Sequence, residues 1–319
     1  MDKGKFEAQI NNIVQLLGPK VQRMHPLGTL TTYRVGGPAW LFYEIETEED
    51  LKKVHEVFIR ADLPLLILGM GSNLLVADSG FCGLVVTLSS GFSSINISDN
   101  KVFAGSALPL PVLGRNLAKH SLSGMEWAVG VPGSVGGAIY MNAGGHGSCI
   151  RDWIKQAGVW DLTTGEDGVL DVAQLGYSYR HSSLAEHQVV LWGEFQLEPG
   201  DSRASQREIA EIVRWRRENQ PGGHNAGSVF KNPPFSSAGR LIQEAGLKGH
   251  RIGSAWVSPK HANFFQVDAK GSADDVRALI DYVRNEVEKR LGVLLELEIK
   301  TVGFGYPSGG SVNGLKLNC

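Results

Sequence analysis

The chain has 319 residues and a mass of 34.5 kDa, with 42% hydrophobic residues, 20% charged residues and a formal net charge of −2. This length exceeds a single ordinary hydrophobic core, so we expect two or three domains. The balanced charge argues against nucleic acid or an anionic membrane as the main partner, because either would require a surplus of positive charge.

The N-terminal residues MDKGKFEAQI lack the apolar stretch of a signal peptide, and no apolar run is long enough to cross a bilayer. We therefore expect a cytoplasmic protein that does not enter a membrane. The three cysteines, Cys82, Cys149 and Cys319, are odd in number and far apart. This spacing predicts neither a disulfide framework nor a metal site, and we expect three free thiols.

The first regular elements lead into a glycine loop. Thr47 and Asp50 have the spacing of a capping box before a helix with one apolar face. The apolar run 65–68 then predicts a strand, and Gly69-Met70-Gly71-Ser72-Asn73-Leu74 follows it directly. A strand that runs into a glycine loop is expected where a sheet edge meets a phosphate group. Position 74 is Leu, so the third glycine of the dinucleotide fingerprint is missing, and a simple tight turn remains the alternative.

The middle of the chain predicts a mixed α+β arrangement rather than repeated strand–helix–strand units. The expected elements are short strands and one helix, namely strands at 85–88, 102–104, 156–160, 168–170 and 189–196 and a helix at 110–119. Residues 130–145 read GVPGSVGGAIYMNAGG, with six glycines in sixteen positions. Glycine has no Cβ and reaches positive φ, so we expect irregular backbone here that brings N–H groups close to a ligand. The two glycine segments together predict a nucleotide cofactor.

The last third begins at a composition break, residues 198–201, after which a helix from Ile209 to Arg217 is expected. The loop 227–234 then reads GSVFKNPP and carries a hydroxyl, a cation and an amide. Between residues 219 and 265, five Lys and Arg side chains face one acid, Glu244, which gives a local charge of +4 by count. This excess predicts an anion site around the loop, although a turn ended by proline remains the alternative.

A long helix and a strand are expected before the C-terminus. Ser272 caps the helix and Gly292 ends it. Residues 294–300 alternate, which predicts a strand with an apolar face opposite Glu296 and Glu298. The pattern does not rank these two carboxylates. Residues 304–319 lack periodicity and predict a loose tail.

Taken together, eight ordered motifs resemble one family, UDP-N-acetylmuramate dehydrogenase, also called UDP-N-acetylenolpyruvoylglucosamine reductase. This family is the flavoenzyme of peptidoglycan precursor synthesis. The motifs are LTTYRVGGPA at 30–39, GMGSNLL at 69–75, GVPGSVGGA at 130–138, MNAGG at 141–145, YRHS at 179–182, GSVFKNP at 227–233, LIQEAGLKG at 241–249 and LELE at 295–298. The resemblance runs from about residue 30 to residue 303.

The resemblance implies an α+β chain with a two-subdomain FAD-binding fold of the vanillyl-alcohol-oxidase type and a C-terminal α+β substrate domain. The implied boundaries are 1–88, 89–200 and 201–303, followed by a flexible tail at 304–319. The implied activity reduces UDP-N-acetylglucosamine enolpyruvate to UDP-N-acetylmuramate, with NADPH as hydride donor and non-covalent FAD as carrier. The implied partner is a UDP-sugar, and we expect a monomer or a weak oligomer.

The same resemblance assigns roles to residues of this sequence. It implies catalytic roles for Arg180 on the substrate carboxylate, for Ser228 as proton donor, and for Glu298 rather than Glu296, because Glu298 stands five residues before Gly303. The implied cofactor-binding residues are Gly69, Gly71, Ser72, Asn73, Leu74, Pro132, Gly133, Ser134, Gly136, Gly137, Asn142, Ala143 and Gly144. The implied substrate-binding residues are Tyr179, Arg217, Lys231, Asn232, Lys260 and His261.

One departure and two rival interpretations stand beside this resemblance. Residues 181–227 contain no Tyr, so the chain looks like the shorter class, which lacks the loop with a substrate-covering Tyr. An oxidase on the same flavin fold would keep the glycine loops and lose the set Arg180, Ser228 and Glu298. A non-catalytic flavin or UDP-sugar binder is the other rival, and a colourless protein that cannot oxidise NADPH would favour it.

Overall fold

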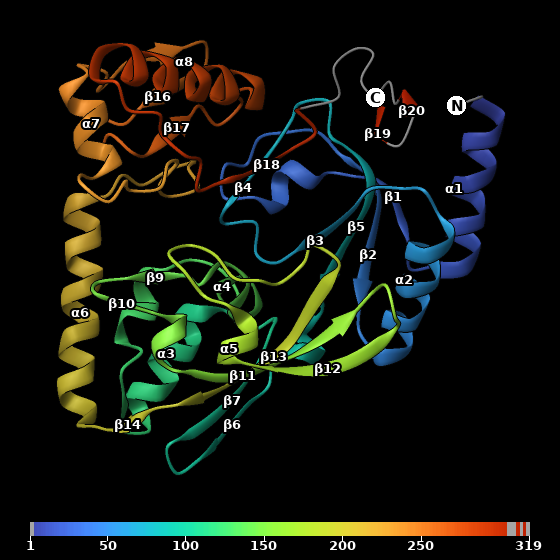
Figure 1. Cartoon of the computed structure of the whole chain (residues 1–319), viewed down its shortest axis with the longest axis horizontal. Coiled ribbons are helices and arrows are strands. Elements are labelled where there is room, and N and C mark those ends of the chain that lie inside the picture. The colour runs from blue at the N-terminus through green and yellow to red at the C-terminus, as the bar shows by residue number, and fades with distance from the viewer. Residues whose placement is uncertain (1–2, 305–310, 313–314, 317–319) are drawn as a thin grey trace. The chain divides into compact units, whose positions relative to one another are not determined.

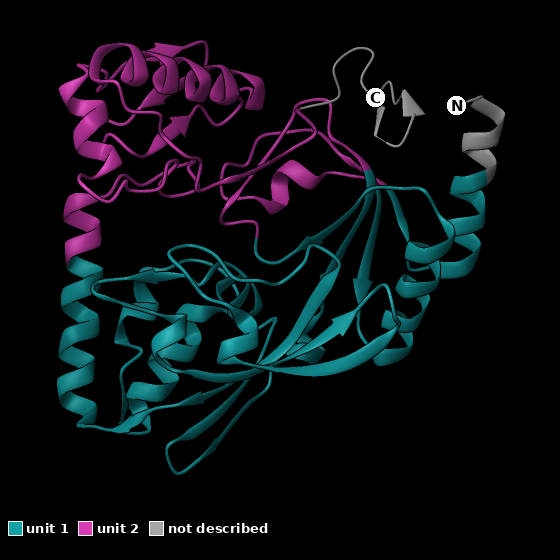
Figure 2. Ribbon diagram, viewed as in Figure 1, with its two compact units in different colours: residues 1–23, 41–70, 83–214 teal, residues 24–40, 71–82, 215–319 magenta. Residues whose placement is uncertain are grey.

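The computed structural model describes residues 3–304, 311–312 and 315–316, and the chain divides into two compact units (Figures 1 and 2). The units are interleaved in sequence. Unit 1 comprises residues 1–23, 41–70 and 83–214, and unit 2 comprises residues 24–40, 71–82 and 215–319. The three-part division expected from the resemblance stays a prediction.

A first sheet, of four strands, lies largely in unit 1. Its strand order is β1 (Gln22–His25), β2 (Ala39–Ile45), β5 (Phe81–Leu88) and β3 (Leu65–Leu68), and β3 runs parallel to β5. Helices α1 (Lys3–Leu17) and α2 (Glu48–Arg60) share its hydrophobic core. The predicted capping box is confirmed, because Thr47 Oγ1 accepts from Asp50 N and the Asp50 carboxylate accepts from Thr47 N, each at 3.2 Å.

The second sheet of unit 1 is antiparallel throughout. Its strand order is β12 (Glu166–Asp171), β11 (Ile154–Asp161), β13 (Gln188–Gln196), β7 (Lys101–Gly105) and β6 (Ile95–Ser98). Its core also includes side chains from α3 (Leu110–Lys119), η3 (Glu126–Gly130), α4 (Val135–Met141) and α5 (Val172–Leu175). The mixed α+β class expected from the sequence is confirmed, and the sheet supports the second glycine segment.

Several short elements complete unit 1. They are the pairs β8 (Leu122–Ser123) with β14 (Glu198–Pro199) and β9 (Gly144–Gly145) with β10 (Ser148–Cys149), and the turns η2 (Ser90–Phe92) and η4 (Ile150–Asp152). Cys149 is a free thiol, as expected. Cys319 lies outside the described residues, so the expectation of three free thiols is confirmed for Cys149 alone.

Helix α6 (Ser202–Asn219) carries the chain from unit 1 into unit 2 (Figure 2). It begins before the predicted Ile209, because its first turns have no apolar periodicity for a sequence pattern to detect. A polar contact stabilises these turns instead, since Ser205 Oγ donates a 2.5 Å hydrogen bond to Glu126 Oε1 in a buried position. Among the described residues, no helix is both long enough and apolar enough to cross a bilayer.

Unit 2 combines a three-stranded antiparallel sheet with two helices. The strands are β15 (Arg251–Ile252), β16 (Ala255–Val257) and β17 (Phe265–Val267), and the helices are α7 (Ala238–Glu244) and α8 (Ala273–Leu291). The unit also contains η1 (Leu27–Leu30) and a parallel pair formed by β4 (Leu74–Val76) and β18 (Lys300–Val302).

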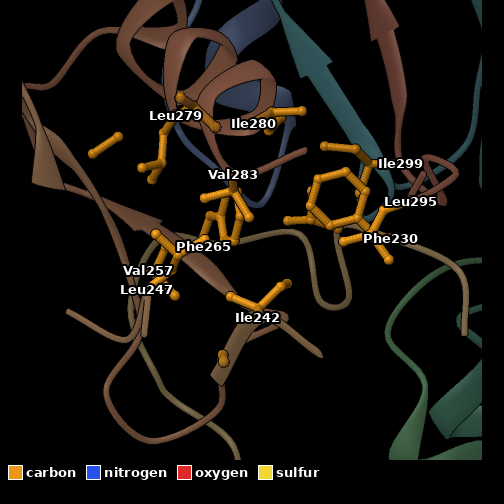
Figure 3. Packing of buried hydrophobic residues seen from close by; sticks show 14 of the residues in the cluster. Phe230, Ile242, Leu247, Val257, Phe265, Leu279, Ile280, Val283, Leu295 and Ile299 are labelled. Atoms are coloured by element: carbon orange, nitrogen blue, oxygen red, sulfur yellow. The ribbon is translucent and has the colours of Figure 1, made fainter. Parts of the chain in front are cut away.

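Helix α8 supplies one side of the unit 2 core. Ser272 Oγ accepts from Asp275 N at 3.1 Å, and Gly292 ends the helix at φ +69°, so both predicted helix ends are confirmed. The core-facing residues are fully buried, namely Val276, Leu279, Ile280, Val283 and Val287. Figure 3 shows the ring of Phe230 beside Leu295 and Ile299 in this core. Phe230, which lies between Ser228 and Lys231, therefore anchors this segment in the core.

The prediction of a strand at 294–300 is wrong, but the predicted alternation of buried and exposed residues is confirmed, since Leu295 and Ile299 are buried and Glu296 is exposed. Only an isolated bridge between Phe230 and Leu297 occurs before β18 begins at Lys300. The N–H groups of Glu298 and Ile299 both point to the carbonyl of Val229, at 2.8 and 3.5 Å, and this shared acceptor interrupts a regular ladder.

The predicted flexible tail at 304–319 falls largely outside the described residues. Within that stretch the structure describes the antiparallel pair β19 (Ser311–Val312) and β20 (Leu315–Lys316).

Candidate active site

The second glycine segment of unit 1 contains a helix, so the expectation of irregular backbone is wrong for residues 135–141. Ser134 caps α4, and its Oγ accepts a hydrogen bond from Gly137 N at 3.2 Å. Val135 and Ile139 are fully buried in the core of the second sheet. This burial stabilises the short helix, although glycine has a low helix propensity and α4 contains two glycines.

Two glycines of the predicted cofactor segments make close contacts within unit 1, and the first of these contacts joins the two segments. A Cβ on Gly69 would lie 2.8 Å from Ser134 Oγ, so the loop after β3 touches the start of α4. A Cβ on Gly136 would lie only 1.8 Å from Ser106 Oγ, so no side chain fits there. Gly69, Pro132 and Gly137 stay exposed near these contacts, and Gly133 is partly exposed with φ +136°. This exposed backbone, where side chains are absent or would not fit, suits a cofactor held by main-chain groups.

Asn142 ends α4 and ties two further loops to it. It adopts a left-handed conformation with φ 45° and is 4% exposed. Its Nδ2 donates to the carbonyl of Ser178 at 2.8 Å, and its Oδ1 accepts from Arg151 N at 3.0 Å. Ala143 N donates to Ala138 O at 2.9 Å. Asn142 thereby fixes the chain just before Tyr179 and Arg180.

Arg180 contacts the predicted cofactor segment directly. Its Nη2 donates a 2.7 Å hydrogen bond to the carbonyl oxygen of Gly144. Its guanidinium also lies 5.1 Å from the ring centre of the exposed Tyr179. The backbone of Arg180 is left-handed, with φ 55°, because Ser178 and His181 close a tight turn around it with two backbone hydrogen bonds. In unit 1, the expected catalytic arginine and the expected cofactor residues are therefore neighbours.

The first glycine loop continues into unit 2 and reaches Glu298. Gly71 has φ +62°, and a Cβ there would lie 2.3 Å from the carbonyl of Leu30, so only glycine fits. Asn73 Nδ2 donates to the carbonyl of Glu298 at 3.0 Å, while Ser72 precedes it in the loop and Leu74 is buried at the start of β4. The loop therefore holds the backbone of a predicted catalytic residue.

Ser228 and Glu298 lie on neighbouring segments of unit 2. Ser228 forms an isolated bridge with Phe264, and the next residue, Val229, donates its N–H to the carbonyl of Asn263 at 2.8 Å. The carbonyl of Val229 accepts from Glu298 N at 2.8 Å. Both side chains are partly exposed. The structure thus brings together the proposed proton donor and the proposed carboxylate of this unit.

The basic excess around the 227–234 loop is smaller than the count suggested. Lys231 Nζ lies 2.6 Å from Glu296 Oε1, and Arg251 is paired with Asp268. Both acids lie outside the counted window of residues 219–265, so linear counting missed them. The loop is therefore not an unpaired cationic patch.

The remaining predicted substrate residues cluster only in part. Lys260 Nζ donates to the carbonyl of Arg217 at 2.5 Å, and both side chains are exposed. Burial, with a smaller contribution from Lys248, lowers the pKa of the neighbouring His261. Asn232 Oδ1 accepts from Ala238 N at 3.0 Å, so this amide helps to begin α7.

The resemblance implied only that the stretch 258–263, which ends at Asn263, lies near the substrate, and it gave this residue no role of its own. Asn263 is 2% exposed. Its side-chain amide bonds both backbone polar groups of Phe230. The available signal was a lone amide within the apolar run 262–265, since a buried amide needs partners.

Comparisons with known proteins find matches to both parts of the chain. Residues 40–167 match the FAD binding domain family, and residues 219–302 match the family described as UDP-N-acetylenolpyruvoylglucosamine reductase, C-terminal domain. The reductase of Synechococcus sp. (strain WH7803) is 41% identical over 293 residues, which are 90% of this chain and 94% of the relative. The reductase of Synechocystis sp. (strain ATCC 27184 / PCC 6803 / Kazusa) is 42% identical over 90% of this chain and 92% of its own.

A solved structure gives the same result at the level of the fold. The crystal structure of UDP-N-acetylenolpyruvylglucosamine reductase (MurB) from Thermus caldophilus has a TM-score of 0.77 and 37% sequence identity. The alignment covers 88% of this chain and 98% of that one. The similarity thus extends over both units.

Proposed function

Because the chain belongs to the UDP-N-acetylenolpyruvoylglucosamine reductase family, we propose that it reduces UDP-N-acetylglucosamine enolpyruvate to UDP-N-acetylmuramate with NADPH. The FAD-binding domain makes it a flavin-dependent oxidoreductase of peptidoglycan precursor synthesis. We place this activity in the cytoplasm. The observation that carries the proposal is the hydrogen bond between Glu298 N and Val229 O, because it joins the segments of Ser228 and Glu298.

Backbone groups of the two glycine segments would hold FAD. Gly69, Ser134, Gly136 and Gly137 provide close approach in unit 1, and Gly71 provides it in unit 2. When bound, FAD supplies the hydride that is added to the methylene carbon of the enolpyruvyl group. The chain itself must bind the substrate, stabilise the negative charge that this addition leaves, and deliver one proton.

Arg180 would bind the substrate carboxylate. Hydride addition leaves negative charge on the neighbouring carbon, and this charge spreads into the carboxylate. A guanidinium presents several N–H donors in one plane and stays protonated, so it can stabilise that enolate as it forms. The bond to Gly144 O orients the guanidinium before the substrate arrives.

Ser228 would donate the proton to the enolate carbon. A hydroxyl is a weak acid, but the enolate carbon is a strong base, so transfer from a positioned serine is feasible. General-acid catalysis of this kind typically contributes about 10²- to 10⁴-fold. Ser228 suits this role because the bridge to Phe264 and the bonds of Val229 fix its backbone on both sides.

Glu298 would orient the substrate or relay a proton near the same carbon. Its backbone is held by two independent contacts, one from Asn73 Nδ2 to its carbonyl and one from its N–H to Val229 O. Glu296, by contrast, is engaged with Lys231 and is largely exposed. This difference supports the assignment of the role to Glu298.

The diphosphate of the substrate would bind to cations and amides of unit 2. Lys231 and Asn232 lie on the loop that also carries Ser228, and Lys260 contacts the backbone of Arg217 near His261. In unit 1, Tyr179 would contribute an exposed aromatic ring beside Arg180. An anion at Lys231 would have to displace Glu296.

Anaerobic mixing in two steps tests the function. The purified yellow protein is first reduced with NADPH and then mixed with the enolpyruvyl sugar nucleotide, and flavin absorbance is followed. We expect the colour to vanish and then return. In Ser228→Ala we expect normal reduction by NADPH and slow reoxidation by the substrate. A colourless protein, or a wild-type flavin that the substrate does not reoxidise, would contradict the proposal.

A further inference from the structure

Asn263 extends the hydrogen-bonded pairing beside the loop that carries Ser228. Its backbone carbonyl accepts from Val229 N at 2.8 Å. Its side chain then bonds the next residue, with Oδ1 accepting from Phe230 N at 3.0 Å and Nδ2 donating to Phe230 O at 2.8 Å. One residue thus makes three hydrogen bonds to two consecutive residues of the 228–231 segment.

The chemistry of these bonds specifies an amide. Phe230 is fully buried, so its N–H and C=O need partners inside the protein. A carboxamide offers one acceptor and one donor side by side, which matches the two backbone groups. A carboxylate at this position would accept from Phe230 N but would place a second acceptor against Phe230 O. An alanine would leave both backbone groups unpaired.

The other side of the segment is held by the chain near Glu298. Val229 O accepts from Glu298 N, and Lys231 N donates to the carbonyl of Glu296 at 2.8 Å. Asn263 therefore provides the second of two restraints on residues 229–230, the first being the 296–298 stretch. If the restraint from Asn263 were removed, Ser228 would keep its hydroxyl group, but the position of that hydroxyl would no longer be fixed.

We propose that Asn263 is a positioning residue for proton delivery, because its amide fixes the backbone from which the Ser228 hydroxyl is presented. This inference rests on the function proposed above. Asn263 does not act on the substrate itself. Its effect should appear only in the step that uses Ser228, whereas a residue that merely stabilises unit 2 would affect all steps alike.

The test compares flavin-loaded variants in the two half-reactions. The variants are Asn263→Ala, the nearly isosteric Asn263→Asp, and the control Ser254→Ala, in which a serine of unit 2 loses its 2.7 Å bond to Asp275. We expect both Asn263 variants to be reduced by NADPH at the wild-type rate. Their reoxidation by the enolpyruvyl sugar nucleotide should slow about 10- to 100-fold, the range expected when a reacting group is displaced by roughly 1 Å. The control should keep both rates.

A double-mutant cycle with Ser228→Ala separates positioning from stability. If Asn263 acts through Ser228, Asn263→Asp should cause no further loss of reoxidation rate in the Ser228→Ala background. The inference would be overturned if the losses of rate in the two single variants multiplied in the double variant. It would also be overturned if both half-reactions slowed equally, or if Ser254→Ala slowed reoxidation as much as the Asn263 variants do. Loss of flavin from both Asn263 variants would also overturn it, by making Asn263 part of the general scaffold. A wild-type flavin that the substrate does not reoxidise would instead contradict the proposed function.

Discussion

Asn73 Nδ2 donates a 3.0 Å hydrogen bond to the carbonyl oxygen of Glu298, across a sequence separation of 225 residues. Lys300 N returns a bond to Asn73 O at 2.9 Å, and the parallel pairing of β4 with β18 continues from there. The glycine loop that the sequence assigned to the cofactor therefore also holds the segment that carries the proposed catalytic carboxylate.

Asn73→Ala should weaken this connection. Loss of the side-chain bond to Glu298 O should reduce the free energy of unfolding by about 1 kcal/mol and slow flavin reoxidation, because Glu298 loses one of its two backbone restraints. Thermal unfolding and the second half-reaction measure the two effects. Asn219→Ala is a matched control, since its amide also bonds a backbone carbonyl but on the exposed face of α6. A variant with wild-type stability and kinetics would refute the expectation.

Arg180→Lys should separate charge from geometry. The lysine ammonium keeps the positive charge but cannot bind Gly144 O and a substrate carboxylate with the planar donors of a guanidinium. We expect flavin content to be unchanged and reoxidation by substrate to slow about 10²- to 10³-fold, as for loss of one oxyanion-stabilising donor. Arg115→Lys, on α3, serves as control because its guanidinium also bonds a backbone carbonyl. Equal reoxidation rates in Arg180→Lys and wild type would remove Arg180 from the mechanism.

The adjacent glycines of α4 should respond in opposite directions to alanine. A Cβ at Gly136 would lie 1.8 Å from Ser106 Oγ, whereas a Cβ at Gly137 would lie 3.4 Å from Ser134 Oγ, an ordinary contact. Gly136→Ala should therefore reduce stability by about 1–3 kcal/mol through overpacking and lower the flavin bound per polypeptide. Gly137→Ala should leave stability unchanged or raise it by up to about 1 kcal/mol, because alanine favours the helix. Flavin absorbance and thermal unfolding test both, and equal behaviour of the two variants would contradict the close approach at Gly136.

Asp50 should make the stability of unit 1 depend on pH. Burial alone would raise the pKa of this carboxyl, but hydrogen bonds from the Tyr43 hydroxyl and Glu46 N, together with Lys20 at 3.6 Å, hold the pKa below its ordinary value. A lowered pKa means that the carboxylate stabilises the fold above the unfolded-state pKa of about 3.9 and loses this effect as the pH falls through the folded-state value.

Asp50→Asn should therefore be less stable than wild type by about 1–3 kcal/mol at neutral pH. The difference should begin to shrink below about pH 4, where the carboxyl of the unfolded chain takes up a proton, and it should vanish once the pH falls below the lowered pKa of the folded state. Denaturant unfolding at both pH values measures it. Glu48→Gln in the same helix, whose carboxylate is exposed, is the control and should show almost no change. A gap that stays constant with pH would rule out the ionised carboxylate as its cause.

Local signals predicted the parts of the fold that depend on neighbouring residues. Thr47 and Asp50 marked the start of α2, and Ser272 and Gly292 marked both ends of α8, because capping chemistry acts within one or two turns. The glycine motifs likewise located residues that meet in unit 1, such as Gly69 and Ser134.

Features that depend on distant partners were missed. The composition of residues 135–141 disfavours a helix, and only burial of Val135 and Ile139 against the second sheet stabilises it. Glu296 and Asp268 reduce the basic excess from positions outside the counted window. These contacts join residues that are far apart in the sequence, so a local sequence pattern does not predict them.

The interleaving of the two units sets the order in which a ribosome can complete them. Every residue of unit 1 is synthesised before residue 215, whereas unit 2 combines stretches that are synthesised early with the stretch that is synthesised last. Tyr33, Val35 and Leu75 are synthesised early, but they are buried in the same hydrophobic core as Phe230 and Leu295, which are synthesised much later. Until synthesis nears its end, the apolar side chains of these early stretches remain exposed to solvent. A chaperone that binds exposed apolar segments can bind them during this interval.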